Sequence, residues 1–341
     1  EAFANNQTLS YTYDRFNRLT AKQGANGSYT YTYNADSNVK TIVDTINDNT
    51  KTFTYDLAQR LVKEINTNGF TTEYEYDINN NVSNIQYKLY DSQDTIQYNY
   101  DSYNRLNKIT NNRSVWERQM DTLSRVSKNI ISNGRKNYTT DYEYLTVNGE
   151  DNKTSTYISK VHNEGELLIE YEYNNNGNIK TRERGAYINE YYYNDANELV
   201  RENNKELNKT IVYTYDSNGN ILNKKEYSYT TQDTLPTTPN KTIEYTYENT
   251  NWKDQLTKYD GKQITYDAIG NPLTYDGNNY TWQNGRQLAE ICNSSKNQTI
   301  TYKYNENGIR TQKTINGITT NYFLDGTKVI YENIGPVTIT Y

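Results

Sequence analysis

The sequence predicts an all-β protein built as a long ribbon of β-hairpins. Three observations predict this fold. A short aromatic motif recurs along nearly all of the 341 residues, apolar and polar residues alternate within each copy, and turns rich in Gly, Asn and Asp separate the strands. No segment of useful length shows helical periodicity.

The repeat unit is an aromatic residue, any residue, a second aromatic and Asp or Asn. Three or four polar residues usually follow, then Arg or Asn and an aliphatic residue. Measured on the second aromatic, the first steps along the chain are 20, 22, 21 and 24 residues. The repeat-defining residues are Tyr13, Asp14, Tyr33, Tyr55, Asp56, Tyr76, Asp77, Tyr100, Asp101, Tyr173, Tyr193, Tyr215, Asp216, Tyr266, Asp267, Trp282 and Tyr304.

Each repeat accommodates two short strands and two turns. A segment such as Tyr31-Thr32-Tyr33 places two aromatics on one face and a threonine on the other, and both residue types favour strands. Lys40-Thr41-Ile42-Val43 supplies a return strand, and pairs such as Asn26-Gly27 supply the turns. Because one hairpin is marginally stable in water, each must pack against its neighbours.

The repeats predict a single continuous array over residues 1–341. The step lengthens to 29 residues between Tyr144 and Tyr173, and to 32 between Tyr215 and Tyr247. These two intervals contain polar insertions at about 145–163 and 228–241, which we expect to form loops because the repeat phase resumes after each.

The composition indicates where the apolar surface comes from. Hydrophobic residues make up only 33% of the chain, yet 38 residues are tyrosine. A tyrosine ring buries a large area while its hydroxyl still needs a partner. We therefore expect tyrosine faces that line a wide interior or a ribbon and do not fill a compact centre.

Several functional classes are excluded or disfavoured by the same counts. One cysteine, Cys292, excludes an intrachain disulfide framework, and one histidine, His162, leaves no His-pair metal site. We expect no cofactor, no metal and no catalytic residues. The net charge of −6 gives no reason to expect nucleic acid, and no apolar stretch is long enough to span a membrane.

The recurring aspartates admit two interpretations. Paired carboxylates can perform acid–base catalysis. However, Asp and Asn alternate freely at this position, and Asn does not ionise, so capping of a tight turn by the shared side-chain oxygen is favoured. The segment Asp216-Ser217-Asn218-Gly219-Asn220 resembles a calcium loop only loosely, because Gly at the sixth position and Glu at the twelfth are missing.

The tyrosine ladders also admit two interpretations. Aromatic faces stack on sugar rings, which would suit a glycan-binding module. Cross-strand pairs of tyrosine with tyrosine or aliphatic residues would equally hold the ribbon together. We favour the second interpretation, because each strand needs those contacts in order to form.

At these residues the chain resembles the tyrosine–aspartate (YD) repeat proteins, which include Rhs and wall-associated polymorphic toxins, Tc-toxin cocoon subunits and teneurins. The segments at 264–273, 280–288 and 302–311 look especially like later Rhs-type repeats. The resemblance implies that the β-hairpin ribbon spirals into an open or partial hollow shell around a C-terminal cargo. The Asp-Pro-x-Gly signature of self-cleaving Rhs cores is absent, because no proline in this sequence follows an aspartate.

From this resemblance we predict a non-enzymatic structural segment of a secreted or cell-surface bacterial toxin. Its partner would be a C-terminal toxin domain of the same polypeptide, which it encapsulates or presents. Because the sequence begins at Glu1 without a secretory leader, we expect a processed product or a fragment of a longer protein. The alternative function is a cell-surface adhesin or glycan-binding repeat module.

Overall fold

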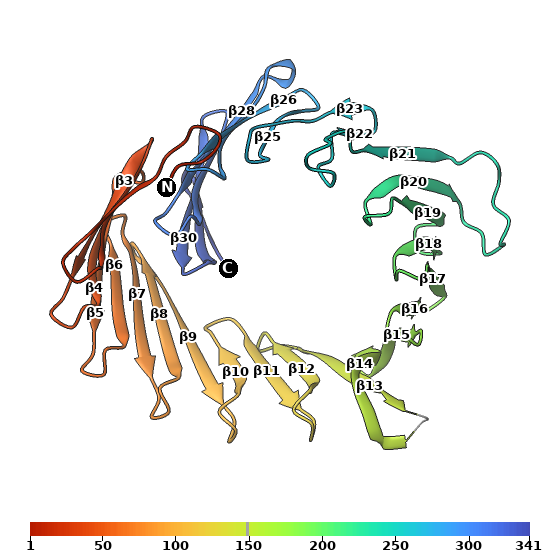
Figure 1. Cartoon of the computed structure of the whole chain (residues 1–341). Helices are drawn as coiled ribbons and strands as arrows, with labels where there is room; N and C mark the ends of the chain where they lie inside the picture. Colours follow the sequence, from red (N-terminus) through yellow and green to blue (C-terminus); the bar gives the residue numbers. More distant parts are fainter. Residues whose placement is uncertain (148–149) are drawn as a thin grey trace. The chain divides into compact units, whose positions relative to one another are not determined.

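The structure is a computed structural model that describes residues 1–147 and 150–341. Over these residues the protein is all-β, and its one helical element is a single 3-10 turn at Ser294–Lys296. Consecutive strands pair antiparallel as hairpins, so the predicted all-β hairpin repetition is confirmed (Figure 1). The chain divides into two compact units: unit 1 comprises residues 1–97 and 263–341, and unit 2 comprises residues 98–262.

Unit 1 contains two sets of sequentially paired strands, which we call its first and second sheets: the first belongs to a 23-stranded sheet, and the second is a separate nine-stranded sheet. The first sheet comprises β1 (Ser10–Tyr13), β2 (Leu19–Gly24), β3 (Gly27–Tyr33), β4 (Val39–Asp44), β5 (Asn49–Tyr55), β6 (Leu61–Asn66), β7 (Phe70–Tyr76), β8 (Val82–Leu89) and β9 (Ser92–Tyr100). The second comprises β24 (Thr265–Tyr266), β25 (Pro272–Tyr275), β26 (Asn278–Gln283), β27 (Gln287–Asn293), β28 (Gln298–Tyr304), β29 (Arg310–Ile315), β30 (Ile318–Asp325), β31 (Lys328–Ile334) and β32 (Val337–Thr340).

Unit 2 repeats the same hairpin pattern. Its strands are β10 (Leu106–Thr110), β11 (Val115–Met120), β12 (Val126–Ser132), β13 (Asn137–Val147), β14 (Glu150–Asn163), β15 (Glu166–Tyr173), β16 (Ile179–Arg184), β17 (Tyr187–Tyr193), β18 (Leu199–Asn204), β19 (Lys209–Tyr215), β20 (Ile221–Ser228), β21 (Lys241–Thr246) and β22 (Lys258–Tyr259). The two-residue strand β23 (Lys262–Gln263) lies at the boundary between the units.

The two polar insertions differ in structure. Between Ser228 and Lys241 no strand is assigned, as expected for a loop containing Pro236 and Pro239. The expectation of a loop at 145–163 is wrong for most of that range, because its residues extend β13 and β14; residues 148–149 lie outside the described part. This insertion contains Thr154, Thr156, Tyr157 and Ile158 in β14, and these residue types favour strands, which accounts for the longer hairpin.

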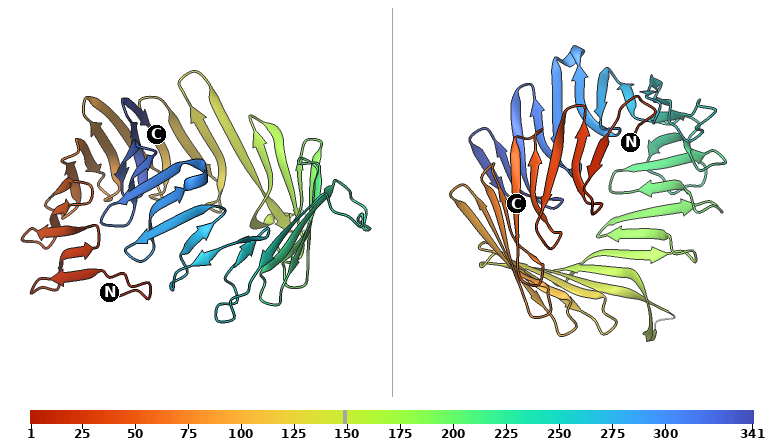
Figure 2. Two further views of the ribbon diagram at one scale, coloured as in Figure 1. Left: turned by 90° about the horizontal axis from the view of Figure 1, so that it is seen from above. Right: turned by 60° about the vertical axis from the view of Figure 1, so that its left-hand side comes forward.

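Unit 1 has a packed aromatic core between its two sheets. Phe70 and Tyr87 from the first sheet stack with ring centroids 6.1 Å apart, and Phe70 also meets the rings of Phe323 and Tyr331 from the second sheet at 5.9 and 6.0 Å. All four side chains are buried. Figure 2 shows these two groups of hairpins next to each other, red to orange and blue.

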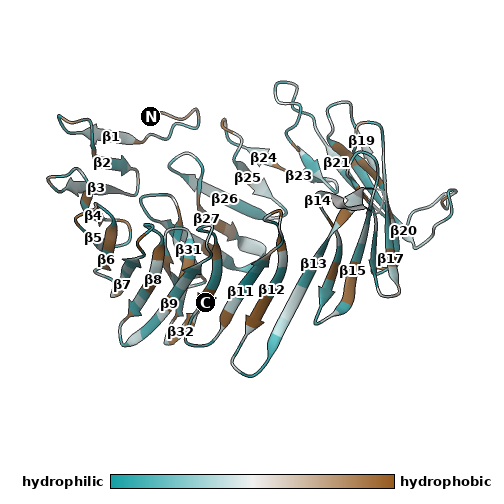
Figure 3. Cartoon of the chain, turned by 90° about the horizontal axis from the view of Figure 1, so that it is seen from below, coloured by the Kyte–Doolittle hydropathy of each residue, from teal (hydrophilic) through white to brown (hydrophobic). Residues whose placement is uncertain are grey.

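This core corrects part of the expectation that the tyrosines line a wide interior or a ribbon and do not fill a compact centre, because some tyrosines are fully buried. The buried tyrosines of unit 1 are Tyr29, Tyr87 and Tyr331, which lie outside the repeat-defining positions. Tyr29 and Tyr87 alternate with polar residues along their strands, whereas Tyr331 follows the buried Ile330, and Figure 3 shows the mixture of hydrophobic and hydrophilic segments. Buried aromatic side chains thus add to the few buried aliphatic residues of unit 1, such as Ile42, Ile85 and Leu89.

Candidate functional site

The Asp or Asn of each repeat caps the turn that follows it. Asp56 is representative: its Oδ1 accepts hydrogen bonds from the backbone N–H groups of Ala58 and Arg60, both at 2.9 Å, and its Oδ2 accepts one from Nε of Arg60 at 2.8 Å. The same pair of Oδ1 bonds, to the second and fourth following residues, recurs at Asp14, Asn34, Asp77, Asp101, Asp121, Asn174, Asn194, Asp216, Asp267 and Asn305.

The capping geometry explains why Asp and Asn interchange and why other residues recur in the turn. Only the shared Oδ1 is needed for the backbone bonds. The third residue after each cap has a left-handed backbone, with φ of 61° at Asn17, 64° at Gln59 and 85° at Gly219. Gly and Asn tolerate that conformation best, which accounts for their frequency there.

In eight repeats the second tyrosine bonds its hairpin to the preceding one. The hydroxyl of Tyr55 donates to the carbonyl oxygen of Val39 at 2.9 Å. Equivalent bonds join Tyr33 to Leu19, Tyr76 to Leu61, Tyr144 to Val126, Tyr173 to Ile158, Tyr193 to Ile179, Tyr215 to Leu199 and Tyr304 to Leu288. We call this set the phenol ladder.

A β-bulge creates the acceptor of the phenol ladder. In the hairpin of β3 and β4 the register shifts between Thr32 and Tyr33, so that Tyr33 pairs with Val39. On its other side, β4 begins to pair with β5 only at Thr41. The Val39 carbonyl therefore lies outside the backbone hydrogen bonds between β4 and β5, and the Tyr55 hydroxyl donates a hydrogen bond to it. This explains why the repeat carries its tyrosine at one fixed position.

Arginine adds a second link between neighbouring turns. The guanidinium of Arg60 is bonded to its own cap, Asp56, lies 4.5 Å from the ring centroid of Tyr76, and donates from NH1 to Oδ1 of Asn80 at 2.8 Å. Arg18 and Arg105 make the matching bonds to the hydroxyls of Ser37 and Ser124. One cation thus joins a turn to the tyrosine and the turn of the next repeat.

Two degenerate repeats keep the inter-hairpin bond with a different donor. In the copy that ends at Met120, NH2 of Arg118 donates to the carbonyl of Leu106 at 2.6 Å. In the copy at Trp282, the indole Nε1–H donates to the carbonyl of Pro272 at 2.7 Å. In these two copies a guanidinium and an indole N–H therefore take the place of the tyrosine hydroxyl as donor.

The second candidate site is the seam, by which we mean the surface between the two sheets of unit 1. Besides the aromatic core, hydroxyls bond carboxylates across it. Asp325 accepts from Tyr74 at 2.8 Å and from Tyr87 at 2.6 Å, while Tyr331 donates to Asp94 at 2.9 Å. Burial and the charge of Asp325 raise the pKa of Tyr74. Both hydroxyl and carboxylate partners are thus satisfied within the seam.

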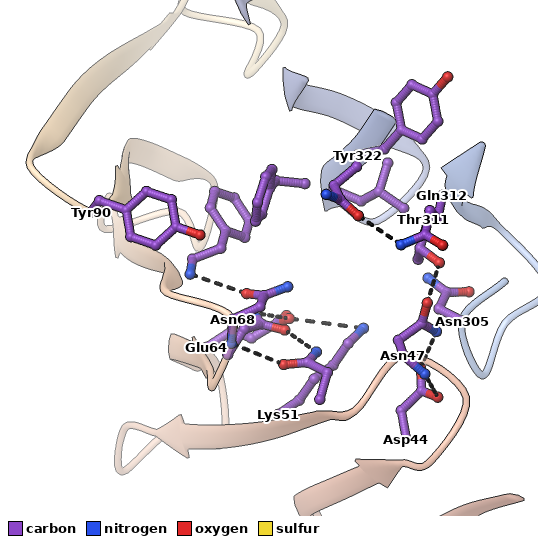
Figure 4. A pocket seen from close by; sticks show the side chains of 16 residues that line it. Asp44, Asn47, Lys51, Glu64, Asn68, Tyr90, Asn305, Thr311, Gln312 and Tyr322 are labelled. Carbon is purple, nitrogen blue, oxygen red and sulfur yellow. Dashed lines mark hydrogen bonds and ion pairs between the residues drawn. The ribbon is translucent and has the colours of Figure 1, made fainter. Parts of the chain in front are cut away.

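A polar cavity of about 210 Å³ opens along the seam. Asp44, Lys51 and Glu64 line it from the first sheet, and Asn305 and Gln312 line it from the second (Figure 4). Burial raises the pKa of Asp44 and of Glu64. Among the described residues no group of three or more His, Cys, Asp or Glu side chains is placed to hold a metal ion.

The remaining candidates from the sequence contribute no site chemistry. The oxygens of Asp216 are engaged by Asn218 and Asn220 of its own turn. His162 lies 2.8 Å from Oε1 of Glu143, and Cys292 is a half-buried free thiol. Tyr13 belongs to the first hairpin and is 57% exposed.

Sequence reasoning missed the residues of the seam. Lys51, Glu64 and Asp325 carry no motif, and Asp325-Gly326 has the sequence of an ordinary turn. The signal in the sequence that could have indicated a packed core was the presence of two large aromatics, Phe70 and Tyr87, in strand segments outside the repeat motif.

The fold and the phenol ladder define an antiparallel hairpin-repeat protein with tyrosine–aspartate repeats. Its sequence is similar to the tRNA nuclease WapA of Bacillus subtilis (strain 168), with 36% identity over 144 residues, 41% of this chain and 6% of WapA. It is 44% identical over 86 residues to the tRNA(Glu)-specific nuclease WapA of Bacillus subtilis subsp. natto, 24% of this chain and 4% of that protein. The chain thus spans a small fraction of these relatives. These matches support the predicted resemblance to the YD-repeat proteins in its broad form.

Two solved structures are also similar. TcdB2-TccC3-TEV matches with a TM-score of 0.49 and 14% identity over 95% of this chain and 22% of that chain. TcdB2-TccC3-Cdc42 matches with a TM-score of 0.47 and 14% identity over 98% and 21%. No family model matches the chain. No helix in the described residues is long and apolar enough to cross a membrane.

Proposed function

We propose that this chain is a non-enzymatic wall segment of a secreted or cell-surface bacterial toxin, and that it encloses or presents a C-terminal toxin domain of the same polypeptide. The phenol ladder carries this proposal. A bond that repeats from hairpin to hairpin lets a wall grow by adding copies, because each new tyrosine finds the same carbonyl in the copy before it.

The chemistry of the repeats supports a structural role. The recurring carboxylates serve as turn caps, and their oxygens are taken by backbone N–H groups and by arginine or asparagine side chains. These bonds hold the pKa of Asp14 and Asp77 below its ordinary value, so both are ionised acceptors at neutral pH. A general acid needs the opposite shift.

The similarity to WapA supports the association with a toxin. Nuclease activity is a property of those relatives, and this chain matches a small part of them. Glycan binding stays a prediction. The tyrosine hydroxyls of the phenol ladder already donate hydrogen bonds to backbone carbonyls, which disfavours that alternative.

Limited proteolysis of the full-length gene product, including the sequence that follows Tyr341, tests the proposal. We expect a downstream domain that resists protease in the wild type and becomes sensitive when Tyr33, Tyr55 and Tyr76 are all changed to Phe. The control is Tyr13→Phe, because the Tyr13 side chain is 57% exposed and, among the described residues, its hydroxyl makes no phenol-ladder bond. Equal protease sensitivity of the downstream domain in all three proteins, or no downstream domain at all, would contradict it.

A further inference from the structure

In the seam, Lys51 is the ion-pair partner of two carboxylates, Glu64 and Glu306. Nζ of Lys51 lies 2.8 Å from Oε1 of Glu306 and 3.9 Å from Oε1 of Glu64. The Lys51 and Glu64 side chains are each 16% exposed, and that of Glu306 is 4% exposed. Glu64 belongs to β6 of the first sheet, whereas Glu306 follows β28 of the second. Lys51 therefore connects the sheets but leaves one of two adjacent negative charges without a counter-ion.

Further negative charge surrounds this triad. Asp44 lines the same cavity, and Asp325 lies at the end of β30. The other nearby cation, Lys22, donates to the backbone carbonyl of Glu306 at 3.2 Å. Within the described residues, Oε2 of Glu306 is buried and has no hydrogen-bond partner. The seam thus holds more carboxylates than cations.

The groups that face each acid can be named. Glu64 faces Lys51, Glu306, Asp325, Tyr55 and Tyr74. Burial raises its pKa first, and the charges of Glu306 and Asp325 raise it further, whereas Lys51 and the Asn66 amide oppose them.

Asp44 faces Glu306, Tyr29 and Tyr31, and accepts hydrogen bonds from Ile46 and Asn47. Burial raises its pKa despite those bonds, and Glu306 adds to the effect. Burial likewise raises the pKa of Tyr31 to about 12, so the tyrosines stay neutral in the physiological range.

We propose that the seam of unit 1 is a pH-sensitive latch, whose two sheets close more tightly as the pH falls, because protons taken up by the carboxylate cluster remove charge buried between them. The polar cavity gives water and protons access to Glu64 and Asp44. Acidification would fasten the hairpins of residues 263–341 onto those of residues 1–97.

The direction follows from linkage. An acid whose pKa is raised in the closed state contributes stability that is complete below its ordinary pKa, about 4, and is lost as the pH rises through the raised value. The turn caps act in the opposite sense but at lower pH, because their pKa is lowered below 3.8. They therefore do not mask the latch between pH 5 and 8.

Hydroxyl-radical footprinting of the full chain, read by mass spectrometry, tests the latch. Phe70, Tyr87 and Tyr331 are 2%, 2% and 0% exposed and become oxidisable only when the seam opens. Each unit of pKa difference between closed and open states changes the opening equilibrium about tenfold, so we expect their oxidation to rise from pH 5 to pH 8. Tyr227, buried in unit 2, is the internal control and should stay constant.

The matched variants are Glu64→Gln and Glu73→Gln. Glu73 is a half-exposed glutamate of the adjacent strand, paired with Lys63 at 2.8 Å, and its Gln variant should retain the wild-type pH response. Glu64→Gln should flatten that response. Wild-type oxidation that does not rise with pH overturns the latch, as does an equal change in Tyr227 or an undiminished response in Glu64→Gln. Should Glu64→Gln not fold, the wild-type titration with its Tyr227 control decides alone.

Discussion

Replacing Tyr55 by phenylalanine should loosen the hairpin of β5 and β6 by about 1 kcal/mol, the usual net contribution of one hydrogen bond. The change removes the hydroxyl that donates to the Val39 carbonyl at 2.9 Å and keeps the ring. Because Tyr55 is half-buried, water can reach the carbonyl, so the larger penalty for a fully buried unsatisfied group does not apply. One kcal/mol corresponds to about a fivefold increase in local opening.

Local hydrogen exchange is the suitable assay, because stability varies along a repeat array and neighbouring hairpins open separately. Amide protection in residues 49–66 should fall about fivefold in Tyr55→Phe, while protection in unit 2 is unchanged. Tyr13→Phe is the matched control, since Tyr13 is 57% exposed and lies in the first hairpin. Equal protection losses in the two variants would refute the role assigned to the phenol ladder.

Three other outcomes follow from the turns and the ladder. Asp267→Ala should reduce the free energy of unfolding of unit 1 by about 1–2 kcal/mol in urea denaturation, because it removes the acceptor of two backbone N–H groups. Asp267→Asn retains Oδ1 and should lose less, and an equal loss in the two variants would contradict the capping role. On acidification below about pH 4, the turn at Asp56 should lose amide protection. The pKa of Asp56 is lowered chiefly by the hydrogen bond from the Arg60 backbone N–H, and this stabilisation disappears as the carboxylate is protonated. The turn at Asn34 should not respond, and a matching loss of protection there would refute the assignment. Arg118→Met should lower amide protection in β10 and β11 about fivefold, because the Leu106 carbonyl loses its hydrogen-bond donor. Unchanged hydrogen exchange would contradict the inference that the Arg118 guanidinium takes the place of the tyrosine hydroxyl in this repeat.

Local pattern made the hairpins and turns predictable. Tyr-x-Tyr alternation, Gly and Asn in turns, and the interchange of Asp56 with Asn34 at equivalent positions all depend on neighbours within a few residues. The insertion at 145–163 shows the limit of the same reasoning, because polar residues with good strand propensity can extend a hairpin as readily as they form a loop.

The sequence by itself determined the strand class, the repeat phase and the position of each cap, because these follow from side-chain alternation and turn chemistry. Tertiary structure alone decided which carbonyl each tyrosine bonds, and it alone brought Lys51 and Tyr87 against Glu306 and Asp325. The physical reason is that a bulge frees an acceptor only once two hairpins are paired, and that contacts between segments more than 200 residues apart depend on packing that no local pattern encodes.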